Sequence, residues 1–470
     1  MKTAHIIGSG PNGLAAAITL AQAGVSVSVY ERNGRLGGAC SSAELTLPGF
    51  LHDLGASALP MAACSPFFRT LPLAEYGFQL LQPELPLAHP FDDGTAIALS
   101  QGLDGMQDQL SPADFIAWRQ LFGPTVRDWE ILIPELLAPI LHIPRHPLAL
   151  ARFGIPALLP ATTLARSAFR DPRTRALFAG NAAHAVMPLS SPLCASFGIV
   201  LVAAAHAVGW PVAAGGSQAL TDALARLLES LGGVIHLNHP VAAISDMPHA
   251  DCTLFDTSTQ RLDRIAGPAL SPSFRASLAR FKPGPGVFKV DWALSGPIPW
   301  AAEACRRAGT IHVGGTLEEI AQAEADVFAN RHADKPFLIL VQPSVADPSR
   351  APAGQHVAWA YCHVPNGSTL DRTNAIESQV ARFAPGFRDT ILARRTHTTA
   401  QLEAWNPNLT GGDLSGGAMN ARQLLMRPTI RDYATNNPAL YLCSSATSPG
   451  GGVHGMCGHQ AAKLALQRSR

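Results

Sequence analysis

Residues 1–31 constrain the fold of this chain more than any other stretch, because they contain five local signals in a fixed order. An apolar run of strand type, Ala4 to Ile7, leads into the glycine-rich turn GSGPNG at residues 8–13. A helical pattern from Leu14 to Ala23 follows, and Val25 to Tyr30 alternates like a second strand that ends at Glu31. Strand, G-x-G-x-x-G turn, helix, strand and acid in this order are typical of a βαβ unit that binds a nucleotide.

Each residue type in this unit has a physical task. Gly8 permits a tight turn, Gly10 lets the backbone approach a pyrophosphate, and Gly13 lets the helix pack closely on the strand. The first N–H groups of the helix have no partner within it, so they and the positive end of the helix dipole attract phosphate. Glu31 can accept hydrogen bonds from a ribose 2′-hydroxyl and would repel a 2′-phosphate, which disfavours an NADP site. The predicted nucleotide site also includes Pro11 and Asn12.

A basic, glycine-rich loop directly after Glu31 extends this site. Its sequence, RNGRLGGACSS at residues 32–42, brings further N–H donors and arginines to the ribose-binding acid. The loop resembles the R-x-G-G segment of the two-domain FAD enzymes that include amine oxidases and carotenoid desaturases. In many of those a second arginine follows the paired glycines, whereas this chain has an alanine, which favours the phytoene-desaturase-like branch. The resemblance implies that FAD contacts Arg32, Arg35, Gly37, Gly38 and Ala39.

The C-terminal region contains a second strand, glycine-rich turn and helix. Ala439 to Cys443 is an apolar strand, SSATSPGGGVHGM at residues 444–456 is the turn, and Gln460 to Leu466 is helical. Such a turn also aims backbone N–H groups at a negative or carbonyl-bearing ligand. The order resembles the C-terminal flavin segment of phytoene-desaturase-like proteins, which implies that Gly451, Gly452 and Val453 lie at the flavin. Two such turns at opposite ends of the chain suit an FAD domain interleaved with another domain.

Four further segments extend the resemblance over most of the chain. They are GVFKVDWAL (286–294), HVAWAYCHVPNGS (356–368), GGDLSGGA (411–418) and PGGGVHGMCG (449–458). They are similar to segments of the phytoene dehydrogenase-related proteins, and more narrowly of the branch known as pyridine nucleotide-disulfide oxidoreductase domain-containing protein 2, although no redox C-x-x-C motif occurs here. The resemblance implies an α/β fold with two interleaved domains: a Rossmann-like FAD domain, and a substrate domain with a mixed sheet and a helical cap.

The pattern along the chain divides it into three regions. Residues 1–75, 206–265 and 406–470 are predicted to form the discontinuous FAD domain. Residues 76–205, which are largely helical and rich in proline, would form the cap, and residues 266–405, which alternate strands and helices, the substrate domain.

The middle part of the FAD domain has its own local signals. Ser217 to Leu231 is predicted to be an amphipathic helix, followed by strands at Val234–Leu237 and Pro240–Ile244. In related flavoproteins the backbone of this piece contacts adenine, and by position that contact falls near Val241.

Composition argues against several classes of function. Hydrophobic residues make up 47% and charged residues 15% of the 470 residues, which predicts about two to three well-packed domains. A formal net charge of +1 and scattered basic residues argue against binding of nucleic acid. The eight cysteines have neither metal-ligand nor disulfide spacing, so no metal site is predicted. Because the first strand begins almost at once, we expect no signal peptide and a cytoplasmic protein.

An apolar region from Ile131 to Leu164 allows two interpretations. It is rich in Leu, Ile and Pro and poor in charge. We favour short helices, broken by proline, around a core, because exposed apolar helices are less common than buried ones. Alternatively, it forms a greasy substrate entrance or a peripheral membrane contact. The longest apolar run, Phe197 to Val208, is too short to span a bilayer, which takes about 20 residues, and is predicted to be a buried helix.

Lys289 is the first candidate for a role in catalysis. A flavin performs hydride chemistry itself, so the protein supplies position and electrostatics. Lys289 lies within the apolar strand 286–294, and in the amine-oxidase-like fold a lysine on a comparable strand lies near flavin N5 and holds a water. Alternatively, Lys289 lies on the solvent face of a sheet edge or pairs with Asp291, which shares its face of the strand.

Three further candidates lie in the segments that resemble flavoproteins. Tyr361 and His363 share one strand face with Trp359. They could form an aromatic wall over the flavin, with His363 as proton donor or acceptor, or could belong to the core. His454 lies inside the C-terminal glycine turn and is a candidate either for a general acid or for a structural residue.

Together these features predict an FAD-dependent oxidoreductase that transfers hydride between flavin N5 and a carbon of a hydrophobic substrate. The reaction would be a desaturation, a saturation or a double-bond isomerisation, and the low charge of the middle regions is consistent with a greasy pocket. Two alternatives are a flavin amine oxidase, against which Ala39 counts, and a flavin-binding regulatory protein without turnover. The sequence leaves the substrate, the reaction direction, the electron acceptor and the oligomeric state open.

Overall fold

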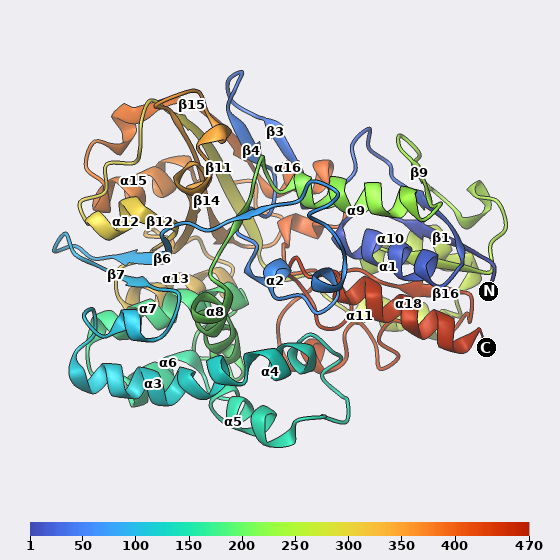
Figure 1. Ribbon diagram of the computed structural model, residues 1–470, viewed down its shortest axis with the longest axis horizontal. Coiled ribbons are helices and arrows are strands. Elements are labelled where there is room, and N and C mark those ends of the chain that lie inside the picture. Colours follow the sequence, from blue (N-terminus) through green and yellow to red (C-terminus); the bar gives the residue numbers. More distant parts are fainter. Residues whose placement is uncertain (470) are drawn as a thin grey trace.

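Two large β-sheets organise the computed structural model, which describes residues 1–469. Figure 1 shows a parallel sheet beside both chain termini, a mixed sheet at the opposite end, and a group of helices below the mixed sheet. The architecture is α/β, as the sequence predicts, and segments from both ends of the chain meet in the parallel sheet.

The parallel sheet has β1 at its centre, because the first strand pairs with β2 on one side and β10 on the other. Consecutive residues of each strand alternate between two cores: Ile6 and Leu254 belong to one cluster, and Ile7 and Phe255 to another on the opposite face. In spatial order the strands are β16 (Leu440–Leu442), β10 (Cys252–Phe255), β1 (Thr3–Ile7), β2 (Ser26–Tyr30) and β9 (Val234–His236).

Helices cover both faces of the parallel sheet, because its crossover connections run over them. On one face α1 packs between α9 and α18, which come from distant parts of the sequence. Residues of α10 and α11 pack in the cluster on the other face. The helices are α1 (Pro11–Gln22), α9 (Gln218–Ser230), α18 (Met456–Arg468), α10 (Thr259–Ala266) and α11 (Pro272–Arg280).

The mixed sheet contains the three strands that the sequence assigns to one sheet, which confirms that prediction. All nine residues of β11 are buried, because β14 and β15 pair with it on both sides. Neighbouring strands are antiparallel except β6 and β12. In spatial order they are β15 (Ile391–His397), β11 (Gly286–Leu294), β14 (His356–Val364), β13 (Leu338–Val341), β12 (Ala308–Val313), β6 (Leu85–Pro90) and β7 (Ala96–Leu99).

Short helices accompany the mixed sheet, and two further strand pairs connect the regions. The helices are α12 (Glu303–Arg307), α13 (Leu317–Phe328), α14 (Pro343–Ala346), α15 (Thr373–Phe383) and α16 (Thr399–Trp405), whereas α17 (Ala421–Leu425) packs in the cluster of the cap helices. The pairs are β3 (Ser42–Glu44) with β4 (Leu51–Asp53), and β5 (Leu80–Leu81) with β8 (Val212–Ala213). Helix α2 (Pro60–Ala63) follows β4.

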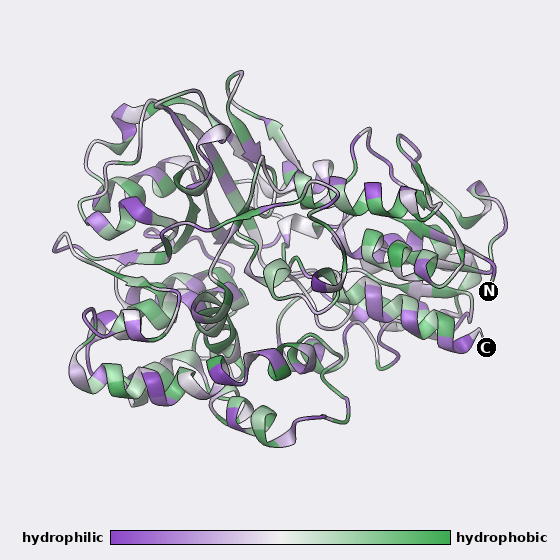
Figure 2. Cartoon of the chain, in the orientation of Figure 1, coloured by the Kyte–Doolittle hydropathy of each residue, from purple (hydrophilic) through white to green (hydrophobic). Residues whose placement is uncertain are grey.

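The helical cap surrounds one buried helix, α8, which carries the longest apolar run and is drawn largely green in Figure 2. Its neighbours α3, α5, α6 and α7 pack against it. The cap helices are α3 (Pro112–Arg127), α4 (Trp129–Leu136), α5 (Pro147–Ala157), α6 (Ala161–Ala168), α7 (Pro172–Ala182) and α8 (Cys194–Val208).

The strand predicted at Pro240–Ile244 is wrong. The chain leaves the parallel sheet after His236, and a left-handed residue, Asn238 (φ 52°), turns it away. Pro240 has no N–H to donate to a neighbouring strand, so the segment continues as an irregular loop.

The favoured interpretation of residues 131–164 as core helices holds for only part of that region. Ala149, Phe153 and Ala157 are spaced four apart and bury one face of α5, whereas Leu148 and Ile155 on its other faces are 74% and 72% exposed. A connecting loop adds exposed apolar residues, Ile140, Leu141 and Ile143. The apolar composition of residues 131–164 does not show which face of a helix is buried. In α5, packing against α8 buries only one of its apolar faces.

Among residues 1–469, no single helix has both the length and the apolar character needed to cross a membrane. Helices α5 and α6 meet those two criteria only when taken together, with a bend of 95° between them.

Candidate functional site

A cavity of about 1280 Å³ lies at the carboxyl ends of the parallel strands and reaches the mixed sheet and the cap. Open parallel sheets bind ligands at this edge. The N-terminal turn at residues 8–12 and the C-terminal turn at residues 449–454 both line this cavity. The two glycine-rich segments from opposite ends of the sequence therefore meet at one site.

The N-terminal turn has no room for side chains at its glycines. Gly8 has φ +101° and donates its N–H to the carbonyl of Tyr30 at 2.9 Å. A Cβ on Gly13 would lie 2.2 Å from the Gly8 carbonyl oxygen, and one on Gly10 would lie 2.7 Å from Oδ2 of Asp256. The turn thus presents bare backbone to the cavity, so that a pyrophosphate could approach it closely.

Glu31 lies at the end of β2 and is 6% exposed. Its Oε2 accepts from the hydroxyl of Ser9 at 2.7 Å and from the Ser9 N–H at 3.2 Å, and its Oε1 accepts from the N–H of Asn33 at 2.9 Å. An ionised carboxylate offers about four acceptor positions. These three bonds orient Glu31 on the cavity and leave capacity for a ribose hydroxyl.

Twelve of the fifteen predicted cofactor residues line the cavity, and three do not. Arg35 donates to the carbonyl of Ser42 instead, and Gly37 donates its N–H to the Ser9 carbonyl at 3.2 Å. Gly13 lies one residue after Asn12, the last residue of the turn that lines the cavity. These three support the cradle from behind. The residues on the cavity are Gly8, Gly10, Pro11, Asn12, Glu31, Arg32, Gly38, Ala39, Val241, Gly451, Gly452 and Val453.

Asp256 is a site residue that the sequence analysis missed. It follows β10 and lines the cavity, and its Oδ2 accepts from the Gly13 N–H at 2.9 Å. Burial, with a contribution from the charge of Glu31, raises the pKa of Asp256 to about 7. An acid directly after a buried strand was the signal in the sequence, but only the sheet order brings β10 next to β1.

We predict that the affinity for FAD falls as the pH rises through about 7 in wild-type protein. Phosphate charge beside Asp256 raises its pKa further, so binding takes up a proton and weakens as the free carboxyl ionises, by at most about tenfold per pH unit. Titration of apoprotein with FAD at several pH values measures this slope. Asp256→Asn should flatten it and the exposed Asp104→Asn should preserve it; an equal slope in all three proteins would contradict the prediction.

His454 lies near the end of the C-terminal turn, two residues before α18, and is 1% exposed. Its Nδ1 accepts from the N–H of Met456 at 3.1 Å, at the start of α18. Burial lowers the pKa of His454 to about 4, so the imidazole is neutral near pH 7. This contact supports the structural alternative for His454, which nevertheless lines the cavity.

Lys289 pairs with Asp291, which is one of the two alternatives that the sequence allowed. Its Nζ donates to Oδ1 of Asp291 and to the carbonyl of Asp53 at 3.1 Å, and it lies 4.9 Å from the centre of the Trp359 ring. Among the described residues Trp359 lines the cavity and Lys289 does not. The lysine therefore lies behind the aromatic wall of the site.

The aromatic wall itself consists of Trp359 and Tyr361 on β14. Their rings are nearly parallel, with centroids 5.9 Å apart and planes inclined by 13°, and both line the cavity. His363 shares their side of the strand, but its Nδ1 lies 2.8 Å from Oε2 of Glu324 on α13, and in the described chain it does not reach the cavity.

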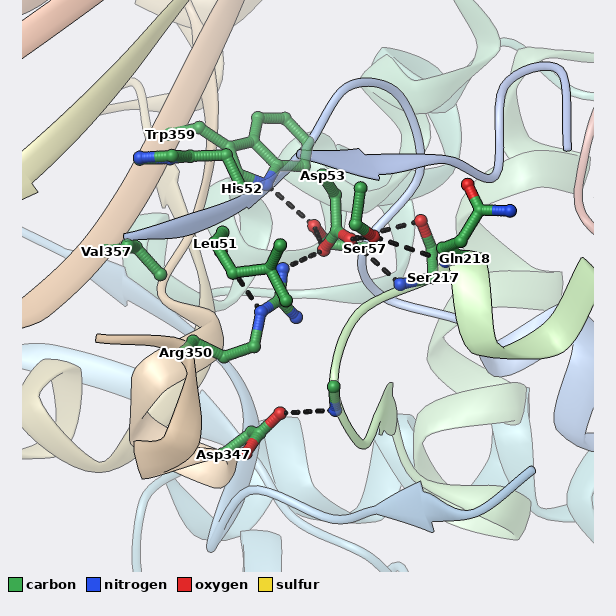
Figure 3. A network of polar contacts seen from close by, with 12 residues as sticks. Leu51, His52, Asp53, Ser57, Ser217, Gln218, Asp347, Arg350, Val357 and Trp359 are labelled. Carbon is green, nitrogen blue, oxygen red and sulfur yellow. Dashed lines mark hydrogen bonds and ion pairs between the residues drawn. The ribbon is translucent and has the colours of Figure 1, made fainter. Parts of the chain in front are cut away.

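A buried charge network holds the wall to the parallel-sheet region (Figure 3). Asp53 forms an ion pair with Arg350 at 2.9 Å, and it accepts from the Ser217 N–H at 2.8 Å. Burial raises the pKa of Asp53, but Arg350 and the serine hydroxyls outweigh it and hold that pKa below its usual range. Ser57 links the network to the wall, because it accepts from Trp359 Nε1 at 2.7 Å.

Beyond the wall, the cavity continues as a limb lined mostly by apolar side chains of the cap. They come from α4, α5 and α8, and on α5 they include Phe153 and Ala157 of its buried face. Examples are Leu136, Leu150, Phe153, Ala157, Phe197 and Leu201. The site thus combines a nucleotide cradle with an apolar chamber.

A nucleotide cradle joined to an apolar chamber across two interleaved sheets defines the class of α/β flavoprotein oxidoreductases. The model of the family described as flavin containing amine oxidoreductase matches residues 12–457. The chain belongs to this family, which implies a flavin cofactor. The glycine cradle and the free capacity of Glu31 fit such a group.

Individual relatives share only low sequence identity with this chain. The chain is 24% identical to a rat protein named pyridine nucleotide-disulfide oxidoreductase domain-containing protein 2, over 99% of this chain and 93% of the relative. It is 25% identical to a lycopene-forming phytoene desaturase of a Paracoccus species, over 97% and 95%. A solved oxidoreductase from Methanosarcina mazei has a TM-score of 0.66 at 16% identity, over 99% and 100%. These findings confirm the fold class and the family resemblance.

Proposed function

We propose that this chain is an FAD-dependent oxidoreductase that acts on a hydrophobic substrate by hydride transfer between a substrate carbon and flavin N5. Desaturation, saturation and double-bond isomerisation are all within this chemistry. One observation carries the proposal: turns from both ends of the chain line a single cavity that continues into an apolar limb. The similarity to phytoene desaturases supports the same substrate class. When bound, FAD supplies the site that accepts or donates hydride.

The residues of this chain would bind the cofactor, orient the substrate and exclude water. We propose that Gly8, Gly10 and the start of α1 hold the pyrophosphate, that Glu31 holds the ribose, and that Val241 lies at the adenine. The Trp359–Tyr361 wall would orient the substrate, and the apolar limb would exclude water from the reacting carbon. We propose residues 1–75, 206–265 and 406–470 as the FAD domain, 76–205 as the cap and 266–405 as the substrate domain. Two segments cross these bounds: β6 and β7 join the mixed sheet, and α11 packs on the parallel sheet.

The entrance of the apolar limb supports a peripheral membrane contact as part of this proposal. Ile143 is 93% exposed, and Leu141 and Leu148 are also exposed beside it. Figure 2 shows hydrophobic stretches on α5, at the lower edge of the cap. An apolar surface next to an apolar entrance would let a hydrophobic substrate pass from a lipid phase to the site without crossing water.

The absorption spectrum of purified protein tests the proposal, followed by mass analysis of the released cofactor and of co-purifying apolar molecules. For a desaturation we expect one of these molecules to bleach bound FAD under anaerobic conditions and to lose two hydrogens. For a saturation we expect the molecule to reoxidise FAD that was first reduced with dithionite, and to gain two hydrogens. An isomerising enzyme would instead convert the molecule without a change in mass. A colourless protein would refute the proposal. Flavin that dithionite reduces but no apolar molecule affects would favour a regulatory protein without turnover.

A flavin amine oxidase is the second candidate, and the description of the matched family favours it. Ala39, in place of the second arginine of the loop, counts against it. Release of hydrogen peroxide from a panel of primary and secondary amines distinguishes the two reactions.

Lys289→Met tests whether the buried lysine supports the flavin chemistry. We expect the rate of flavin reduction to fall about tenfold, equivalent to about 1.4 kcal/mol in the barrier, because a positive charge behind Trp359 stabilises charge that develops at the site. Asp291→Asn is the matched control, since it removes the partner and keeps the amine. A rate unchanged from wild type in Lys289→Met, measured by stopped-flow absorbance, would end this role for Lys289.

A further inference from the structure

Polar side chains line the cavity where α7 meets the mixed sheet, and we call this part its inner end. His184, in the turn after α7, lines this end together with Thr310 of β12 and Tyr361. Trp210 packs edge-on against His184, with ring centroids 5.7 Å apart. The flavin cradle and the charge network described above use neither His184 nor Thr310.

His184 is hydrogen-bonded to a second histidine, His312, which is fully buried in β12. Their Nε2 atoms lie 2.8 Å apart, so one ring donates an N–H to a hydrogen bond and the other ring accepts it. Burial lowers the pKa of His184 to about 3 and lowers the pKa of His312 well below its usual value. Both rings are therefore neutral near pH 7, and two tautomeric arrangements are possible.

The backbone of α7 distinguishes the two arrangements. Nδ1 of His312 is buried and has no hydrogen-bond partner among the described residues. A Cβ built on Gly180 would lie 2.7 Å from this atom, so a Cα–H bond of Gly180 points at it. A lone pair on Nδ1 accepts this weak contact, whereas an N–H there would face another hydrogen and would be a buried donor without acceptor.

The proton of His312 therefore lies on Nε2 and is donated to Nε2 of His184. Because His184 is neutral, its own proton then lies on Nδ1, the ring nitrogen that the histidine pair leaves free for the cavity. The buried pair thus sets His184 as a hydrogen-bond donor toward the inner end of the cavity rather than as a base.

We propose that His184 binds a neutral oxygen atom, a carbonyl or a hydroxyl, of an otherwise apolar substrate. This subsite rests on the proposed function only in taking the apolar limb as the substrate site. None of the residues named at the inner end carries a positive charge that would match a carboxylate, and the hydrogen-bonded pair of Glu324 and His363 adjoins Tyr361. A pure hydrocarbon would leave the N–H of His184 without a hydrogen-bond partner, and this unpaired donor would lower the affinity for a hydrocarbon.

Calorimetric titration of the flavin-loaded protein with four matched C8 probes tests the subsite. The probes are octane, octan-2-one, octan-1-ol and octanoate. We expect wild-type protein to bind octan-2-one or octan-1-ol about fivefold to tenfold more tightly than octane, the contribution of one hydrogen bond. The order of these two oxygen probes distinguishes a carbonyl from a hydroxyl, and octanoate should bind most weakly.

Substitutions at the histidine pair then assign the preference. His184→Phe keeps a ring of similar size and should remove the preference while octane binds as before. His184→Gln, which restores a neutral N–H donor, should recover part of it. Gly180→Ala should also reduce it, because the new Cβ displaces His312. His142→Phe changes another histidine of the same cavity, at its outer limb, and should leave the preference intact.

Three outcomes would overturn the subsite. They are equal affinity of wild-type protein for octane and octan-2-one, an equal loss of affinity for both in His184→Phe, and no saturable binding of any probe. These titrations involve no hydride transfer. A selective ketone affinity in a protein that never reduces its flavin would therefore refute the proposed function and leave the subsite standing.

Discussion

Gly458→Ala is expected to abolish flavin binding and to destabilise the fold by about 3 kcal/mol or more. A Cβ at this position would lie 1.8 Å from the carbonyl oxygen of Asn12 and 3.0 Å from the N–H nitrogen of Ala16. Both contacts are backbone atoms of α1, so no side-chain rotation relieves them. Helix α18 would have to move away from α1, and the two glycine turns at the starts of these helices would separate.

Urea unfolding and the flavin absorbance of the purified variant measure the two effects. Gly154→Ala in α5 is the matched control, because a Cβ there meets nothing within 4 Å. Alanine is favoured over glycine inside a helix by up to about 1 kcal/mol, so this control should be neutral or slightly stabilising. Wild-type flavin content and an unchanged unfolding midpoint in Gly458→Ala would contradict the packing of the two helices.

Arg350→Met is expected to destabilise the protein by about 3–5 kcal/mol, because it leaves the carboxylate of Asp53 buried without its cation. Arg350 and Asp53 are both fully buried, and Arg350 also donates from Nε to the Leu51 carbonyl at 3.1 Å. Figure 3 shows how this pair connects the end of β4 with the start of α9 and with the turn at Arg350, which precedes β14 of the mixed sheet. The loss should therefore weaken the junction between the two sheets.

The pH dependence of unfolding provides a second measurement for Arg350→Met. In wild-type protein the lowered pKa of Asp53 contributes stability that is present above its unfolded pKa and is lost as the pH falls. Without Arg350, burial would raise that pKa, so the contribution changes sign and stability falls as the pH rises past the unfolded pKa. Urea unfolding in mildly acidic and neutral buffers tests this reversal.

Two variants separate this effect from a general loss of packing. Arg350→Met/Asp53→Asn removes the unpaired charge as well and should recover part of the stability. Arg69→Met breaks the exposed ion pair with Glu130, and it should cost about 1 kcal/mol or less. An equal loss in Arg350→Met and in Arg69→Met would refute the role of the buried pair.

Local patterns in the sequence predicted the elements around the nucleotide site. The glycine turn, the helix after it and Glu31 at the end of β2 have the expected order, although α1 begins at Pro11 rather than at Leu14. Such signals are readable because each one depends on neighbouring residues: a strand period, a glycine at a tight turn, a helix start. The prediction of a strand at Pro240–Ile244 failed because the left-handed Asn238 and then Pro240 end the pairing with the parallel sheet.

Contacts between distant residues were not predictable in the same way. The Asp53–Arg350 pair and the His184–His312 pair join residues 297 and 128 positions apart, and no motif announces either. Asp256 follows a plain apolar strand, and its pKa is raised by burial and by the charge of Glu31, both of which depend on the fold. The exposed side of α5 is apolar like its buried side, so only packing on α8 distinguishes them.

The sequence by itself determined the βαβ unit and the second glycine turn, because those depend on residue types at short spacing, and its resemblance to known flavoproteins indicated the class of FAD enzymes. The tertiary structure decided which polar groups face the cavity and which are consumed behind it. Lys289 pairs with Asp291 on its own strand, whereas His363 and His184 pair with Glu324 and His312 from distant segments. Burial makes an unpaired polar atom costly, so the partners that the fold brings close decide which groups stay free.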